Sequence, residues 1–134
     1  MGVRRELEEN FDFEIVDEFL EHFSMMVDIM EPLIINLAKE NSYKNDVNEL
    51  FRIFHNLKSA SSFLKLEPVM RLSTFVENAL ETLRNQDGPA NEEVITWLLS
   101  ISDMFEKWYD DLKLDNELSK IEFSLLKLPD MDIN

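Results

Sequence analysis

Several features that define common protein classes are missing from this 134-residue chain, which has no cysteine, two glycines and four prolines. Without cysteine the chain can form no disulfide framework, thiolate nucleophile or zinc–thiolate site. A membrane-spanning helix needs about 20 consecutive apolar residues, and the sequence contains no such run. Residues 1–5 lead directly into acidic residues, without the apolar stretch of a signal peptide. We therefore expect a cytoplasmic protein without a membrane role.

Positive charge is also scarce, because 13 Lys and Arg stand against 28 Asp and Glu, for a formal net charge of −15. Such an acidic surface repels the phosphates of nucleic acids and anionic lipids, so we expect neither as a partner. A protein partner with a basic docking rim is compatible with this charge.

The two histidines, His22 and His55, do not form a metal motif. Carboxylate-bridged di-iron bundles use paired Glu-x-x-His motifs, whereas Phe19 and Arg52 occupy the positions three residues before these histidines. We expect no metal and no cofactor. His22 lies at the edge of an apolar stripe and is interpreted as structural.

The composition favours an all-α fold, because 45% of the residues are apolar while glycine, proline and alternating β-branched runs are rare. Short connections between long amphipathic segments predict an antiparallel four-helix bundle (up-down-up-down) with an additional C-terminal helix. Pro32 predicts a kink or break, and Asp46 is expected to be an N-cap, with Glu49 in capping-box position. Asn91 is expected to cap the fourth helix of the bundle. The predicted helices cover residues 13–39, 47–65, 68–85, 91–112 and 116–127, within an N-terminal extension (1–12), a bundle domain (13–128) and a frayed tail (129–134).

His55 is the most informative residue, because helical periodicity places it beside, and not within, the apolar seam of its segment. At about 100° per residue, it faces outward together with a cation one turn away and small hydroxyl residues. This arrangement leaves the imidazole within reach of another protein and suggests a phosphoryl acceptor. The seam residues are Val47, Leu50, Phe54, Leu57, Ser61 and Leu64, and the outward neighbours are Asn48, Arg52, Lys58, Ser59 and Ser62.

The segment His55 to Leu66, His-Asn-Leu-Lys-Ser-Ala-Ser-Ser-Phe-Leu-Lys-Leu, resembles the signature of histidine-containing phosphotransfer (HPt) domains. The strongest likeness is to the N-terminal phosphotransfer module of chemotaxis-type histidine kinases. This resemblance implies a phosphorelay module of two-component signal transduction, with no nucleotide or metal site of its own. It would accept a phosphoryl group on Nε2 of His55 and exchange it with an aspartate of a response-regulator receiver domain. The implied partners are that receiver domain and a histidine kinase.

The resemblance also assigns roles to two residues near His55. Lys58 would pair with the phosphoryl oxygens, and Glu77 would orient the imidazole. Apolar, basic and small hydroxyl residues beside His55 would form the docking surface for the partner. These docking candidates are Phe51, Arg52, Ser59, Ser62, Phe63, Lys65 and Leu66.

Three positions depart from the family pattern. Ser59 and Lys65 replace family glycines, and Thr74 stands where kinase-linked relatives often have a second histidine. If Lys65 must adopt a positive φ angle, its Cβ is unfavourable there. Otherwise, the helix continues without a left-handed cap, or Lys65 supplies a second cation to a partner.

The sequence leaves alternatives for the function of the chain and for its context. A helical adaptor or scaffold that binds a signalling partner without being phosphorylated is the alternative function. The chain could be a free-standing carrier or a domain of a larger kinase. A monomer is expected.

Overall fold

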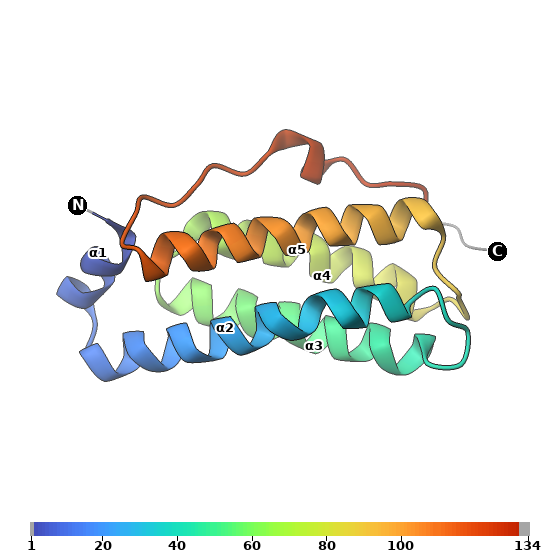
Figure 1. Cartoon of the computed structure of the whole chain (residues 1–134), viewed down its shortest axis with the longest axis horizontal. Helices are drawn as coiled ribbons and strands as arrows, with labels where there is room; N and C mark the ends of the chain where they lie inside the picture. Colours follow the sequence, from blue (N-terminus) through green and yellow to red (C-terminus); the bar gives the residue numbers. More distant parts are fainter. Residues whose placement is uncertain (1, 132–134) are drawn as a thin grey trace.

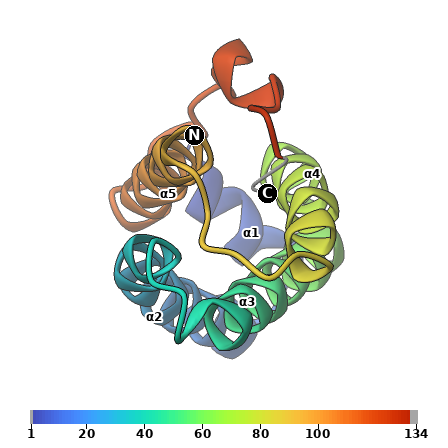
Figure 2. The same ribbon diagram turned by 90° about the vertical axis from the view of Figure 1, so that its right-hand side faces the viewer.

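In a computed structural model of the chain, which describes residues 2–131, α2 to α5 form an antiparallel four-helix bundle (Figure 1). Viewed along its axis, the bundle has α3 packed between α2 and α4, while α5 packs on α2 (Figure 2). No strand occurs in residues 2–131, so the predicted all-α bundle is confirmed. The elements are α1 (Val3–Asn10), α2 (Phe13–Asn36), α3 (Tyr43–Phe63), α4 (Glu67–Arg84), α5 (Glu92–Lys113) and a turn of 3-10 helix, η1 (Phe123–Leu126).

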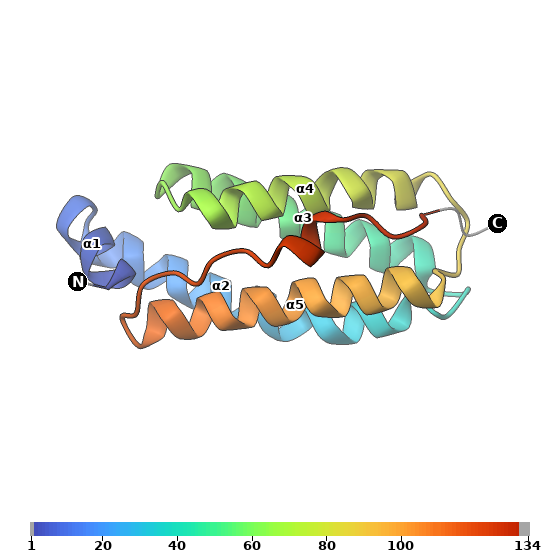
Figure 3. The ribbon, with the colours of Figure 1, turned by 90° about the horizontal axis from the view of Figure 1, so that it is seen from above.

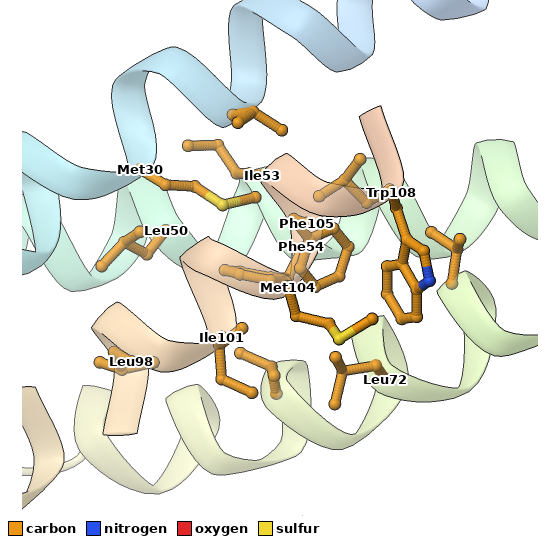
Figure 4. Close-up of a cluster of buried hydrophobic side chains, with 14 of the residues drawn as sticks. Met30, Leu50, Ile53, Phe54, Leu72, Leu98, Ile101, Met104, Phe105 and Trp108 are labelled. Atoms are coloured by element: carbon orange, nitrogen blue, oxygen red, sulfur yellow. The ribbon is translucent and has the colours of Figure 1, made fainter. Parts of the chain in front are cut away.

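The bundle core follows from the apolar stripe of each helix, in which buried residues recur every three or four positions. Phe54 of α3 contacts Phe105 of α5 edge to face, with ring centroids 5.3 Å apart, and Phe105 contacts Trp108 in the same way at 5.1 Å. Met30, Leu72 and their neighbours fill the space around these rings (Figure 4). This core fixes which faces of α3 and α4 point outward.

Two predicted helix starts agree with the structure. The Asn91 side chain accepts a hydrogen bond of 2.8 Å from the Val94 N–H, as an N-cap does. Pro68 lies in the first turn of α4. Backbone N–H groups in a first turn form no hydrogen bond within the helix, so proline costs none there.

The interpretation of Asp46 as an N-cap is wrong. The helix α3 begins at Tyr43, and the Asp46 N–H donates to the Ser42 carbonyl within its first turn. The reason is Tyr43, whose fully buried side chain donates a hydrogen bond of 2.8 Å to the Leu83 carbonyl at the end of α4. This contact favours an additional helical turn, which sequence periodicity alone did not indicate.

Of the kink or break predicted at Pro32, the break does not occur: α2 continues through Pro32 to Asn36 as one helix. Met30 and Ile34 on either side of Pro32 are fully buried, so packing of both halves of the helix against the core compensates for the missing backbone hydrogen bond. The helix ends before the predicted residue Lys39.

The N-terminal extension contains the short helix α1, which lies at one end of the bundle beside α2 and α5 (Figure 1). Val3 and Leu7 bury their side chains there. The Val3 N–H donates to the Asn116 carbonyl, and the Arg5 N–H donates to the Asp115 carboxylate.

The predicted helix at residues 116–127 is wrong apart from the single turn η1. Residues 114–131, here called the C-terminal strap, are otherwise non-helical and run along the open side of the bundle between α4 and α5 (Figures 2 and 3). The Trp97 Nε1–H donates to the Leu125 carbonyl at 2.9 Å, and the Trp108 Nε1–H donates to the Ser119 carbonyl at 2.8 Å. Two carbonyls of the strap thus accept hydrogen bonds from indoles of α5, and not from backbone N–H groups of a helix.

The first residues of the predicted frayed tail are hydrogen bonded to the bundle. The Asn91 Nδ2 donates to the Asp130 carbonyl and the Gln86 Nε2 donates to the Met131 carbonyl, while residues 132–134 lie outside the described part of the chain. Among the helices of residues 2–131, none has the length and apolar character to cross a membrane.

Candidate functional site

The candidate site lies where α3 and α4 pack against each other, and His55 is at its centre. The His55 side chain is 53% exposed, in agreement with its position beside the apolar seam of α3. Glu77 extends from α4, and its Oε2 atom lies 3.4 Å from His55 Nδ1. In an imidazole ring the two nitrogens point in different directions, so a contact at Nδ1 leaves Nε2 available to another molecule.

Lys58 lies one turn after His55 and binds the same carboxylate. Its Nζ atom is 3.0 Å from Glu77 Oε1 and 2.9 Å from Oε2. Glu77 is only 13% exposed, and its Oε2 atom accepts no hydrogen bond of good geometry in the structure. That oxygen is therefore the natural acceptor for a proton on His55 Nδ1. Lys58, His55 and Glu77 form one connected group.

An aromatic ring and a second cation complete the site. The ring of Phe51, one turn before His55, is almost parallel to the imidazole, with an interplanar angle of 10° and centroids 6.4 Å apart. The Arg84 guanidinium carbon lies over the Phe51 ring, 4.3 Å from its centroid. Sequence reasoning missed Arg84. Its position seven residues after Glu77, which places both on one face of α4, is the signal that could have found it.

The other predicted docking residues differ in their surroundings. Ser59, Ser62 and Lys65 are exposed, while Arg52 is exposed and forms an ion pair with Glu49 of its own helix. The prediction for Leu66 is wrong, because this side chain is 4% exposed and belongs to the core. It is buried because it directly follows the turn that ends α3, where an apolar residue packs back on the helix.

Lys65 adopts the left-handed conformation, with φ of 59°. The Lys65 N–H donates to the Ser62 carbonyl and the Leu66 N–H donates to the Ser61 carbonyl, which together form a Schellman motif. The helix therefore has the left-handed cap that the family glycine would provide, formed here by a residue with a Cβ. Lys65 is also exposed, so the structure combines the unfavourable φ angle with a cation at the surface.

Thr74, at the position of the second family histidine, donates a hydrogen bond of 2.8 Å from Oγ1 to the Met70 carbonyl. Its hydroxyl is thus bound within its own helix.

An apolar groove of about 500 Å³ runs between α2 and α3. Asn56 and Ala60, close to His55 in the sequence, form part of its α3 wall, and Phe63 is 61% exposed at its side. His22 is exposed in the α2 wall, so the interpretation of His22 as a structural residue is not supported by its environment. The remaining wall residues are Ile15, Glu18, Phe19, Met25, Met26, Ile29 and Leu64.

At this site an exposed imidazole, a shielded carboxylate and an ammonium group are in contact. A neutral imidazole with Nδ1–H directed at a carboxylate has its lone pair on Nε2. Within residues 2–131 no group of three or more His, Cys, Asp or Glu side chains is placed to hold a metal ion.

Comparisons with known proteins agree with this geometry. The model of the Hpt domain family matches residues 14–122, which include all of α2 except its first residue, α3 to α5 and the site. Chemotaxis protein CheA of Borreliella burgdorferi is 26% identical over 114 residues, covering 85% of this chain. The aligned region is 13% of the length of that relative. No solved structure matches the chain. Because the family model covers most of the bundle together with His55, the chain belongs to the Hpt domain family, the histidine phosphotransfer modules of two-component signalling.

Proposed function

We propose that this chain is a phosphoryl carrier that accepts a phosphoryl group on Nε2 of His55 and exchanges it with an aspartate of a response-regulator receiver domain. The observation that carries the proposal is the His55–Glu77 contact of 3.4 Å, which occupies Nδ1 while the ring stays 53% exposed. A phosphoryl acceptor needs one ring nitrogen that carries the proton and a second that is free to attack phosphorus.

In transfer from a phosphoaspartate, the donor is the acyl phosphate on the receiver aspartate. The Nε2 lone pair attacks phosphorus, the P–O bond to the aspartyl oxygen breaks, and the carboxylate leaves with the bonding electrons. The Nδ1 proton stays on the ring, where Glu77 stabilises the positive charge that develops on the imidazole. Phosphoryl transfer depends mainly on positioning and charge, and the receiver would supply its own metal ion. With a histidine kinase and ATP as donor, the same nitrogen would attack the γ-phosphorus.

Lys58 would act in two ways. In the unphosphorylated structure its ammonium group compensates the charge of Glu77, which would otherwise repel an incoming phosphoryl group. Once a phosphoryl group is on Nε2, the flexible Lys58 side chain could contact its oxygens as a point charge.

The groove between α2 and α3 supports a docking role for this face. The helix α2 carries six carboxylates and no Lys or Arg, and one of the six, Glu18, lines the groove among mostly apolar side chains. We propose that a receiver domain docks here with an apolar element flanked by basic residues, since such complementarity steers association. The six are Glu14, Asp17, Glu18, Glu21, Asp28 and Glu31.

A phosphorylation assay distinguishes this function from that of an adaptor. The chain is incubated with a receiver domain that carries a labelled phosphoryl group, or with a histidine kinase and labelled ATP. The label transferred to the chain is then tested for acid lability and base stability. We expect a phosphohistidine on His55 that is lost in His55→Gln. Stable binding of a receiver without any label on His55, or an undiminished label in His55→Gln, would contradict the carrier function and support the adaptor.

A further inference from the structure

The exposed imidazole needs more than one restraint to keep a defined orientation. Rotation of a histidine ring about its second side-chain torsion is broad, because that torsion joins an sp³ and an sp² atom. The contact with Glu77 at 3.4 Å fixes one atom of the ring but not its plane. The Phe51 ring lies almost parallel to the imidazole, at an angle of 10°, with centroids 6.4 Å apart, within the range of an offset aromatic pair.

Arg84 in turn restrains Phe51. Its guanidinium carbon lies 4.3 Å from the centroid of the Phe51 ring, within the range of a cation–π contact. Arg84 also forms an ion pair with Glu81 of its own helix, with Nη1 and Oε2 3.0 Å apart. Both groups that restrain the α3 side chains, Glu77 and Arg84, therefore come from α4.

We propose that Phe51 is a positioning residue for His55 and that Arg84 holds Phe51 in place. Together they keep the imidazole in the plane in which Nδ1 faces Glu77 and Nε2 faces an incoming phosphorus. The proposal rests on the proposed function in that Nε2 of His55 is the accepting atom. It adds a second restraint on the imidazole. Fewer ring orientations are then populated, so less conformational entropy is lost when Nε2 attacks phosphorus.

The test must separate positioning from docking, because Phe51 could also touch a partner. Phosphoramidate serves as the probe, since this small donor needs no docking surface. The Nε2 lone pair attacks its phosphorus, the donor P–N bond breaks, and ammonia leaves with the protons of the donor nitrogen. The initial rate of His55 labelling is measured together with the melting temperature.

The variants are Phe51→Leu, Phe51→Tyr and Arg84→Gln. Phe51→Leu keeps apolar bulk but has no ring plane, and we expect labelling to slow roughly tenfold. Phe51→Tyr restores the plane and should restore the rate. Arg84→Gln removes the cation and should slow labelling about two- to fivefold, the effect of one exposed cation–π contact. The matched control is Arg71→Gln, because Arg71 of α4 is also ion-paired, with Glu67, but has no ring contact within residues 2–131; it is more exposed than Arg84, at 69% against 37%. It should label at the rate of the unmodified chain.

The ring nitrogens of unphosphorylated His55 give a second readout, which a loss of stability alone would not produce. In the unmodified chain we expect ¹⁵N chemical shifts of a single tautomer with the proton on Nδ1. In Phe51→Leu and Arg84→Gln the two shifts should approach each other as the tautomers mix, while Phe51→Tyr keeps them apart.

Two results would overturn the proposal. One is a Phe51→Leu variant with the labelling rate and nitrogen shifts of the unmodified chain. The other is a double variant, Phe51→Leu with Arg84→Gln, in which the two single effects add fully. Full additivity would mean that Arg84 does not act through Phe51. Failure of the proposed function looks different, because the unmodified chain would then receive no phosphoryl group on His55 from kinase or receiver. The nitrogen shifts would still show whether Phe51 and Arg84 orient the ring.

Discussion

The ammonium group of Lys58 contacts both carboxylate oxygens of Glu77, at 3.0 and 2.9 Å, and so fixes the carboxylate beside the His55 ring. This ion pair joins α3 to α4, and the Glu77 side chain in it is mostly shielded from water. It gives the site a defined order of contacts, from Lys58 to Glu77 to Nδ1 of His55.

The first prediction concerns Glu77. Glu77→Ala should slow phosphoryl transfer to His55 about 10- to 100-fold, the range found when a carboxylate that orients a metal-binding histidine is removed. Glu77→Gln keeps an oxygen that can accept the Nδ1 proton but loses the charge, so its rate should lie between those of Glu77→Ala and the unmodified chain. Initial rates with a phosphorylated receiver measure both. Equal rates in all three proteins would show that Glu77 does not orient His55.

The second prediction concerns Lys58. Lys58→Ala should slow transfer by more than it changes stability, since a partly exposed ion pair contributes about 0–1 kcal/mol to the free energy of unfolding. Lys58→Arg keeps a cation and should retain more activity. Transfer rates are compared with urea unfolding curves of the same variants. If the free energy of unfolding fell in parallel with the transfer rate, Lys58 would be a structural residue.

A third prediction follows from the left-handed conformation of Lys65, where a Cβ is unfavourable. Lys65→Gly should stabilise the chain by about 0.5–1 kcal/mol. Lys65→Ala removes the charge but keeps the Cβ, so it serves as the control and should give no such gain. Urea unfolding measures both. A gain of equal size in Lys65→Ala would assign the effect to charge and not to the backbone.

The last of these predictions concerns pH. Burial raises the pKa of Tyr43 from 10.0 to about 12 in the folded chain. The unfolded chain loses the tyrosine proton first, so the folded state binds more protons between these values and stability falls as pH rises through this window. Below pH 10 both states are protonated and Tyr43 causes no pH dependence.

Tyr43→Phe isolates this effect from the titration of other groups. The variant loses the hydrogen bond to the Leu83 carbonyl, at a cost of about 1 kcal/mol at neutral pH. Its stability should then decrease less steeply from pH 10 to 12 than that of the unmodified chain, as measured by melting temperature. Parallel curves for the two proteins would exclude Tyr43 as the source.

Local patterns predicted the parts of the structure that depend on local chemistry. The apolar seam around Phe54 places His55 at the surface, and the amide of Asn91 starts α5, because each depends on residues within a few positions. The predicted group of His55, Lys58 and Glu77 is brought together in the structure. Roles within that group are still predictions.

Long-range contacts explain what the sequence did not predict. Tyr43 begins α3 early because its hydroxyl reaches α4, 40 positions away. Leu66 is buried by the turn that precedes it, and Arg84 joins the site only through the packing of α4 on α3. The segment at residues 116–127 has an apolar periodicity, but its carbonyls at Ser119 and Leu125 accept hydrogen bonds from indoles of α5, which favours a mostly non-helical path.

The strap has a consequence for solvent access to the two tryptophans. Both indole N–H groups donate to carbonyls of that single segment, at Leu125 and Ser119. Neither indole proton can therefore exchange with deuterium unless the segment moves away. Their exchange with heavy water should therefore be slow and of similar rate. The indole signals thus report how often the seam between α4 and α5 opens, independently of the chemistry at the histidine.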